Sequence, residues 1–73
     1  MATYTAEFQH LGTGGWFGHV PATSMEHAQT AVAEELRRRG ADAAVAQQVA
    51  EFAAGGTPVD CPEVGLAVHI TAS

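Results

Sequence analysis

HLGTGGWFGHVP (residues 10–21) sets a cluster of three glycines directly before two aromatic residues, Trp16 and Phe17. Phosphate-binding loops need their glycines between a strand and the N-terminus of a helix, where backbone amides point at the anion. Here strand-forming residues follow the glycines, and no Lys-Ser or Lys-Thr pair comes after them. Because glycine supplies the positive φ angles of tight turns, the stretch predicts the turn of a β-hairpin.

The residues on either side of the glycines are expected to form the two strands of this hairpin. Residues 3–11 alternate with the period of a half-buried strand. Its core side would hold Tyr4, Ala6 and Phe8, and its other side Thr5, Glu7 and Gln9. Residues 16–20 form the partner strand, which Pro21 is expected to end. Two registers stay open, since a shift of one residue exchanges Trp16, Gly18 and Val20 for Phe17 and His19 on the core face.

Two helices are expected after the hairpin. Thr23 and Glu26 fit a capping box, which predicts a helix that runs to about Arg39 and ends at Gly40. Asp42 is expected to cap a second helix, which runs to about Ala54 before Gly55-Gly56. The predicted inward residues are Met25, Ala28, Val32 and Leu36 in the first helix and Val45, Val49 and Phe52 in the second. On the outside, Glu34 and Glu35 are expected to pair with Arg38 and Arg39.

The C-terminal part of the chain predicts one loop and one strand. Residues 55–63 contain paired glycines and two prolines, so a loop is expected there. Residues 64–71 alternate, with Val64, Leu66, Val68 and Ile70 as the buried row. We expect this last strand to run antiparallel to the second strand. It could pair with either strand of the hairpin. The prediction is a single two-layer α+β domain over residues 1–73, in the order β-β-α-α-β, with two helices on one face of a three-stranded sheet.

Composition and charge limit the function classes. The chain has 73 residues and a formal net charge of −5, and its only Lys or Arg residues are the arginines at 37–39. Nucleic-acid binding depends on clustered cations, so we expect no direct DNA binding and a protein partner with a basic surface instead. Neither a signal peptide nor a membrane-length apolar segment is visible, which predicts a cytoplasmic protein without a membrane partner. The small core and a single cysteine also favour a homodimer or a partner complex.

The sequence contains no specific motif for a metal site or for a catalytic residue. His10, His19 and Cys61 are zinc-ligand residue types, but their spacing matches no zinc motif. Cys61 has no neighbouring lysine or expected helix N-terminus to activate its thiol. A small metal- or thiol-dependent enzyme that uses these three residues therefore stays an alternative, and a structural homodimer is another. The main expectation is a protein without catalytic residues, cofactor or metal.

The N-terminal third resembles the opening hairpin of HicB-type antitoxins. The resemblance lies in Tyr4, Ala6 and Phe8, in Gly14-Gly15-Trp16 and in Val20-Pro21. It implies a partial double-stranded-RNA-binding-like fold and a protein that binds and blocks a small ribonuclease toxin, often as an oligomer. The third strand that the family has after its hairpin is missing or displaced here, because the expected helix begins almost directly after Pro21. We also expect no room for the family's C-terminal DNA-binding part. In size and charge the chain is similar in style to phage-encoded inhibitors, including anti-CRISPR proteins, which would act in the host cytoplasm.

Together these observations predict a small acidic binding protein that inhibits or regulates a macromolecular partner by occupying its surface. The expected contact region is the sheet face that the helices leave open, together with any unpaired edge of the last strand, because exposed aromatic residues and sheet edges are common in interfaces. The candidate partner-binding residues are Glu7, Gln9, Trp16, His19 and His69.

Overall fold

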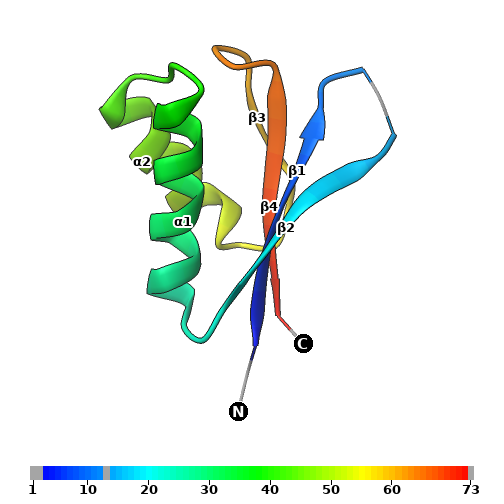
Figure 1. The fold of residues 1–73 in the computed structure, drawn as a ribbon, viewed down its shortest axis with the longest axis vertical. Coiled ribbons are helices and arrows are strands. Elements are labelled where there is room, and N and C mark those ends of the chain that lie inside the picture. Colours follow the sequence, from blue (N-terminus) through cyan, green and yellow to red (C-terminus); the bar gives the residue numbers. More distant parts are fainter. Residues whose placement is uncertain (1–2, 13, 73) are drawn as a thin grey trace.

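The computed structural model describes residues 3–12 and 14–72 and has two helices on one face of a β-sheet (Figure 1). Its elements are β1 (Tyr4–His10), β2 (Trp16–Ala22), α1 (Met25–Arg38), α2 (Ala43–Ala53), β3 (Val59–Cys61) and β4 (Leu66–Ala72). The α+β class and the helices on one face are confirmed. Neither described helix is both long and apolar enough to cross a membrane.

The sheet is four-stranded and antiparallel, with the strand order β2-β1-β4-β3. β4 pairs with β1 over its whole length, from Tyr4 opposite Ala72 to His10 opposite Leu66. Since β1 is antiparallel to both of its neighbours, β4 runs in the same direction as β2. The expectation of a last strand antiparallel to the second one is therefore wrong, and β1 is a central strand. In the described residues β4 pairs with β1 on one side and with β3 on the other, so it has no unpaired edge that could join the expected contact region.

The fourth strand, β3, lies inside the segment that was expected to be a loop, so the prediction of three strands is wrong. Val59, Asp60 and Cys61 pair with β4 residues 66–68. Pro58 and Pro62 flank these three residues, and proline is tolerated at the ends of an edge strand because no ladder hydrogen bond is lost there. A strand this short leaves no readable alternation in the sequence.

A β-bulge in β2 settles the hairpin register, and neither predicted register is correct. Ala6 lies opposite Val20 and Phe8 opposite Phe17, so Gly18 and His19 together face the single residue Glu7. Gly18 has a φ of +67°, the left-handed conformation of the first residue in a glycine-type bulge. The extra residue puts Phe17 and Val20 against the core and leaves Trp16 and His19 on the other face.

Pro21 does not end β2, contrary to expectation. The strand continues to Ala22, and Pro21 lies opposite Thr5 of β1. β2 is an edge strand of the sheet, where proline's missing N–H group can be accommodated.

The helix boundaries agree with the predicted caps except at one residue. Ser24, not Thr23, caps α1: its backbone is extended and its hydroxyl accepts a hydrogen bond of 3.1 Å from the His27 amide. Both residue types can cap, so the sequence allowed either start. Gly40, with a φ of +106°, follows α1, and the Asp42 carboxylate accepts from the Ala44 amide at the start of α2.

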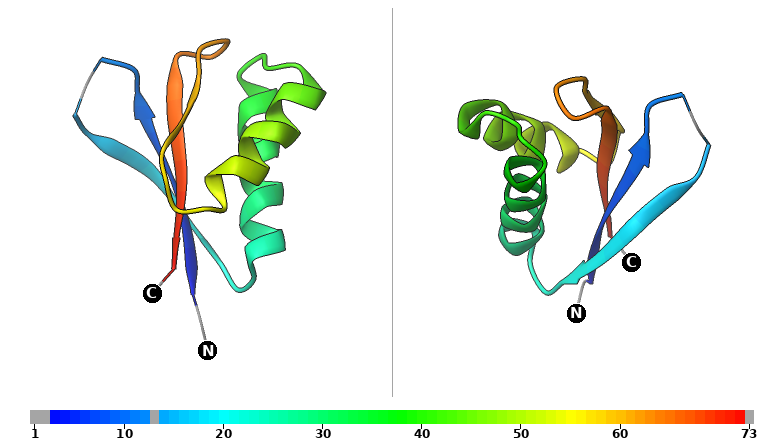
Figure 2. Two further views of the ribbon diagram at one scale, coloured as in Figure 1. Left: turned by 180° about the vertical axis from the view of Figure 1, so that it is seen from behind. Right: turned by 45° about the horizontal axis from the view of Figure 1, so that its top comes forward.

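The core lies between the helices and one face of the sheet (Figure 2). Phe52 was expected inside, but 60% of its surface is exposed. The inward stripe of α2 is Ala46, Val49, Ala50 and Ala53 instead, with Val45 half-buried beside it. Small side chains let α2 approach its neighbours closely, which leaves no room for a phenyl ring on that stripe.

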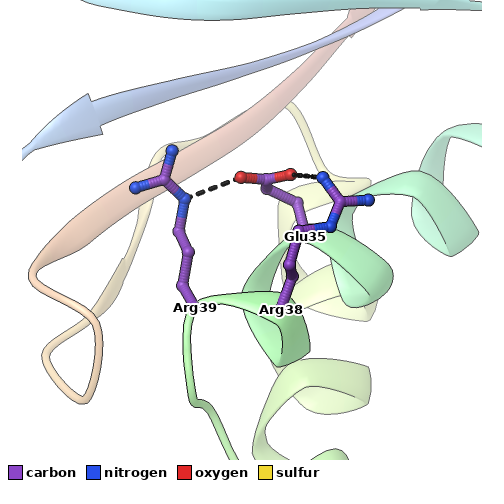
Figure 3. A network of polar contacts seen from close by, with 3 residues as sticks. All are labelled: Glu35, Arg38 and Arg39. Carbon is purple, nitrogen blue, oxygen red and sulfur yellow. Dashed lines mark hydrogen bonds and ion pairs between the residues drawn. The ribbon is translucent and has the colours of Figure 1, made fainter.

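Charged side chains pair with one another at the C-terminal end of α1 (Figure 3). Glu35 accepts from both Arg38 and Arg39, each at 2.7 Å, so the predicted pairing of the arginines with upstream glutamate is confirmed for Glu35. The Arg39 guanidinium also lies 5.7 Å from the ring centre of Phe17 in β2. This contact joins the helix end to the bulged strand on the core side of the sheet.

The buried thiol of Cys61 makes folding sensitive to alkaline pH. Desolvation raises the pKa of this thiol above its ordinary value. The unfolded chain therefore loses the thiol proton at a lower pH than the folded chain. The contribution of the protonated thiol to stability is fully present below the ordinary thiol pKa. It is lost as the pH rises through the pKa of the folded state. We expect the urea midpoint to fall between about pH 7.5 and about pH 10, and to fall less in Cys61→Ala. Equal falls in both proteins would contradict this assignment.

Candidate interaction surface on the open sheet face

Among residues 3–12 and 14–72, both helices lie on one face of the sheet, and the other face carries none (Figures 1 and 2). Strand pairing places side chains from all four strands on this open face. They are Thr5, Glu7 and Gln9 of β1, Trp16, His19 and Pro21 of β2, Asp60 of β3, and Ala67, His69 and Thr71 of β4. The face is therefore built from residues that are distant in sequence and held in register by backbone pairing.

Glu7 lies at the centre of a polar contact between three strands. Its Oε2 is 2.6 Å from Nδ1 of His19, and its Oε1 is 2.9 Å from Nε2 of His69. An ionised carboxylate only accepts hydrogen bonds, so both imidazoles turn an N–H group towards Glu7. His69 and Glu7 are mostly buried on this face, with 14% and 19% of their side chains exposed, whereas His19 is 61% exposed.

Trp16 completes the cluster by stacking on His69. The two ring centres are 3.9 Å apart and the planes differ by 10°. Trp16 belongs to β2 and His69 to β4, so the indole reaches across the central strand β1. Ala67 is only 3% exposed although it lies on this face, which shows that larger side chains cover the sheet here. We call Glu7, Trp16, His19 and His69 the open-face cluster.

Full charges on the open face are negative. Glu7 and Asp60 are its carboxylates, and the arginines at 37–39 belong to α1 and the residue that follows it. With neutral histidines the face is therefore acidic, like the chain as a whole. Such a surface attracts cations and repels phosphate groups.

The residues of the alternative metal or thiol site do not meet. His10 stacks on Phe17 on the core side, with 4.7 Å between ring centres, whereas His19 lies on the open face. Cys61 is buried in the core under the helices. Within residues 3–12 and 14–72, no group of three or more His, Cys, Asp or Glu side chains has a geometry that could hold a metal ion.

Four of the five candidate binding residues come together in the open-face cluster. The fifth, Gln9, is half-buried on the same face and lies opposite both Trp16 and Ala67. The direct contacts of Glu7 and of Trp16 with His69 were not foreseen. The alternation in the sequence places Glu7 and His69 on outward-facing rows. It does not reveal that β4 pairs with β1, which brings the two side chains together.

The open face is a surface and not a cleft: the part of the chain that the structure describes encloses no pocket. Comparison with known protein families, with curated proteins and with solved structures finds no match to this chain. The arrangement can offer an aromatic ring, a carboxylate and two imidazoles to another macromolecule, all from one side of a rigid sheet.

Proposed function

We propose that this protein is a non-enzymatic binding protein that inhibits or regulates a macromolecular partner by covering part of its surface with the open sheet face. The observation that carries the proposal is the open-face cluster: an aromatic ring, a carboxylate and two imidazoles that contact one another on the face without helices. Both helices of the described residues lie on the opposite side of the sheet (Figure 2).

Pre-organisation of these side chains favours binding. Long side chains lose rotamer freedom when they enter an interface, and this loss weakens association. Trp16 and Glu7 are already held by His69 in the free protein, so less freedom remains to be lost. Tryptophan is also one of the residues most enriched among those that dominate interface energies.

The charge of the face favours a partner with a basic surface. Glu7 and Asp60 offer two carboxylates there, and the chain has a net charge of −5. Proteins that handle nucleic acids carry basic surfaces to bind phosphates. The resemblance of the hairpin implies a ribonuclease toxin as the partner, and the size and charge of the chain imply a nucleic-acid-targeting defence complex. Both classes of partner would present such a basic surface.

The proposal is tested by crosslinking from two positions. A photoreactive residue replaces Thr71 on the open face in one protein and Gln47, exposed on the outer side of α2, in the other. In the cells that produce the protein, we expect a discrete crosslinked partner from position 71 and none from position 47. The captured protein is then purified and its own activity measured with and without this chain. Crosslinks only to a second copy of the chain would favour the structural homodimer instead.

If charge on the open face contributes to binding, removing the charge of a glutamate there should weaken binding more than removing it from a glutamate elsewhere. Glu7→Gln removes a charge from the open face, and Glu51→Gln removes the same charge from the exposed side of α2. We expect Glu7→Gln to weaken binding of the captured protein about fivefold at low salt, and Glu51→Gln less than about twofold. Binding by the wild type should also weaken as salt rises. Equal effects of both substitutions would contradict a contact at the open face.

A further inference from the structure

We infer that the open face binds its cationic partner under control of pH, with His19 and His69 as the groups that take up protons. This inference rests on the proposed function. Its structural basis is that both imidazoles contact the same carboxylate, one on each oxygen of Glu7. Imidazole is the side chain that changes charge within the range of cellular pH values.

Proton uptake reverses the charge of the open-face cluster. With Glu7 ionised and both histidines neutral, the cluster carries one negative charge. Each ring uses one nitrogen on Glu7, so the other nitrogen, Nε2 of His19 or Nδ1 of His69, is where a proton is gained. With both rings protonated the cluster carries one positive charge, which cancels the negative charge of Asp60 on the same face and removes the attraction for a basic partner.

The other strands and the helices do not obscure this change. Asp60 on β3 lies opposite Ala67 and is the remaining carboxylate on the open face. Gln9, Thr5 and Thr71 are uncharged. The arginines at 37–39 and His10 lie on the other side of the sheet, where Arg39 and His10 both contact Phe17. The charge of this face is therefore set by Glu7, Asp60 and the two histidines.

Trp16 makes the proton uptake visible in the free protein. It is the only tryptophan of the chain, and its ring is stacked on His69 at 3.9 Å. A protonated imidazole in contact with an indole quenches its fluorescence. We therefore expect Trp16 fluorescence to be lower at about pH 5 than at about pH 8 in the wild type and in His27→Gln, and to be equal at the two pH values in His69→Gln. His27 is an exposed residue near the start of α1, so it serves as the matched control. A level signal in the wild type would overturn the inference.

Binding is measured on a defined probe, a rhodamine-labelled arginine peptide, by fluorescence anisotropy, with circular dichroism to verify that each protein is folded at both pH values. We expect affinity to be about tenfold higher at about pH 7.5 than at about pH 5.5 in the wild type and in His27→Gln. In the double variant His19→Gln/His69→Gln the ratio should drop to about twofold. The pH control alone is overturned if binding by the wild type does not depend on pH. It is also overturned if the ratio of the affinities at the two pH values is the same in the double variant as in the wild type. Absence of binding at both pH values overturns the basic partner as well.

Discussion

Replacing Gly18 by valine lowers the free energy of unfolding by about 2–4 kcal/mol, a large part of what a domain of this size can have. The left-handed φ of +67° strains any residue with a Cβ, and a β-branched residue most of all. A Cβ at this position would also lie 3.0 Å from Cδ2 of Phe8, a side chain of the core. Urea titration of both proteins measures the difference.

Gly15→Val is the control for this prediction. Gly15 lies in the same glycine cluster, but a Cβ there would meet no atom within 4 Å and its φ is not in the left-handed region. We expect a change within about 0.5 kcal/mol. Loss of the bulge should also separate His19 from Glu7, so Gly18→Val is expected to blunt the pH dependence of binding in whatever fraction stays folded. Similar stabilities of the two variants would show that the bulge does not hold the register.

Replacing Trp16 by alanine weakens partner binding by about 30-fold, or about 2 kcal/mol, while the stability of the chain changes little. The indole lies on the open face against His69 and outside the core between helices and sheet. Truncation therefore removes a binding surface and leaves the helix packing intact. Binding of the captured partner and urea unfolding are measured on the same protein.

Phe17→Ala is the matched comparison, because the neighbouring ring points to the other side of the sheet. Phe17 packs against the core and contacts Phe8, His10 and Arg39. We expect it to lose about 1.5–3 kcal/mol of stability and to keep its affinity when folded. If Trp16→Ala destabilised the fold as much as Phe17→Ala while binding survived, the proposed surface would be wrong.

Local signals in the sequence were enough to predict most of the fold. The alternation in residues 3–11 and 64–71, the glycines of the hairpin, Gly40 and the Asp42 cap all act over a few neighbouring residues, and each predicted element is present. β3 was missed because three residues between prolines carry no period. Phe52 was misplaced because an apolar residue next to the inward stripe of a helix looks like a member of it.

The binding surface could be predicted only in part, because its assembly depends on contacts between distant segments. Alternation alone put Glu7 and His69 on outward rows, but the choice of β1 as the neighbour of β4 is a property of the whole sheet. The bulge was hidden because a period of two does not allow for an extra residue. Gly18, flanked by Phe17 and His19, was the available signal, since a glycine inside a strand often marks a bulge.

Much of the packing between the helices and the sheet is made of alanine: Ala28, Ala33, Ala46, Ala50 and Ala53. Methyl groups bury little apolar area, and the close approach of the helices to the sheet leaves no space for larger side chains. Substitutions in the core therefore cannot easily raise the free energy of unfolding. A ligand that binds only the folded form adds about 2.7 kcal/mol when its concentration is a hundred times its Kd. Proteases act on transiently opened chains, so the resistance of this protein to proteolysis should follow the fraction of it that is bound.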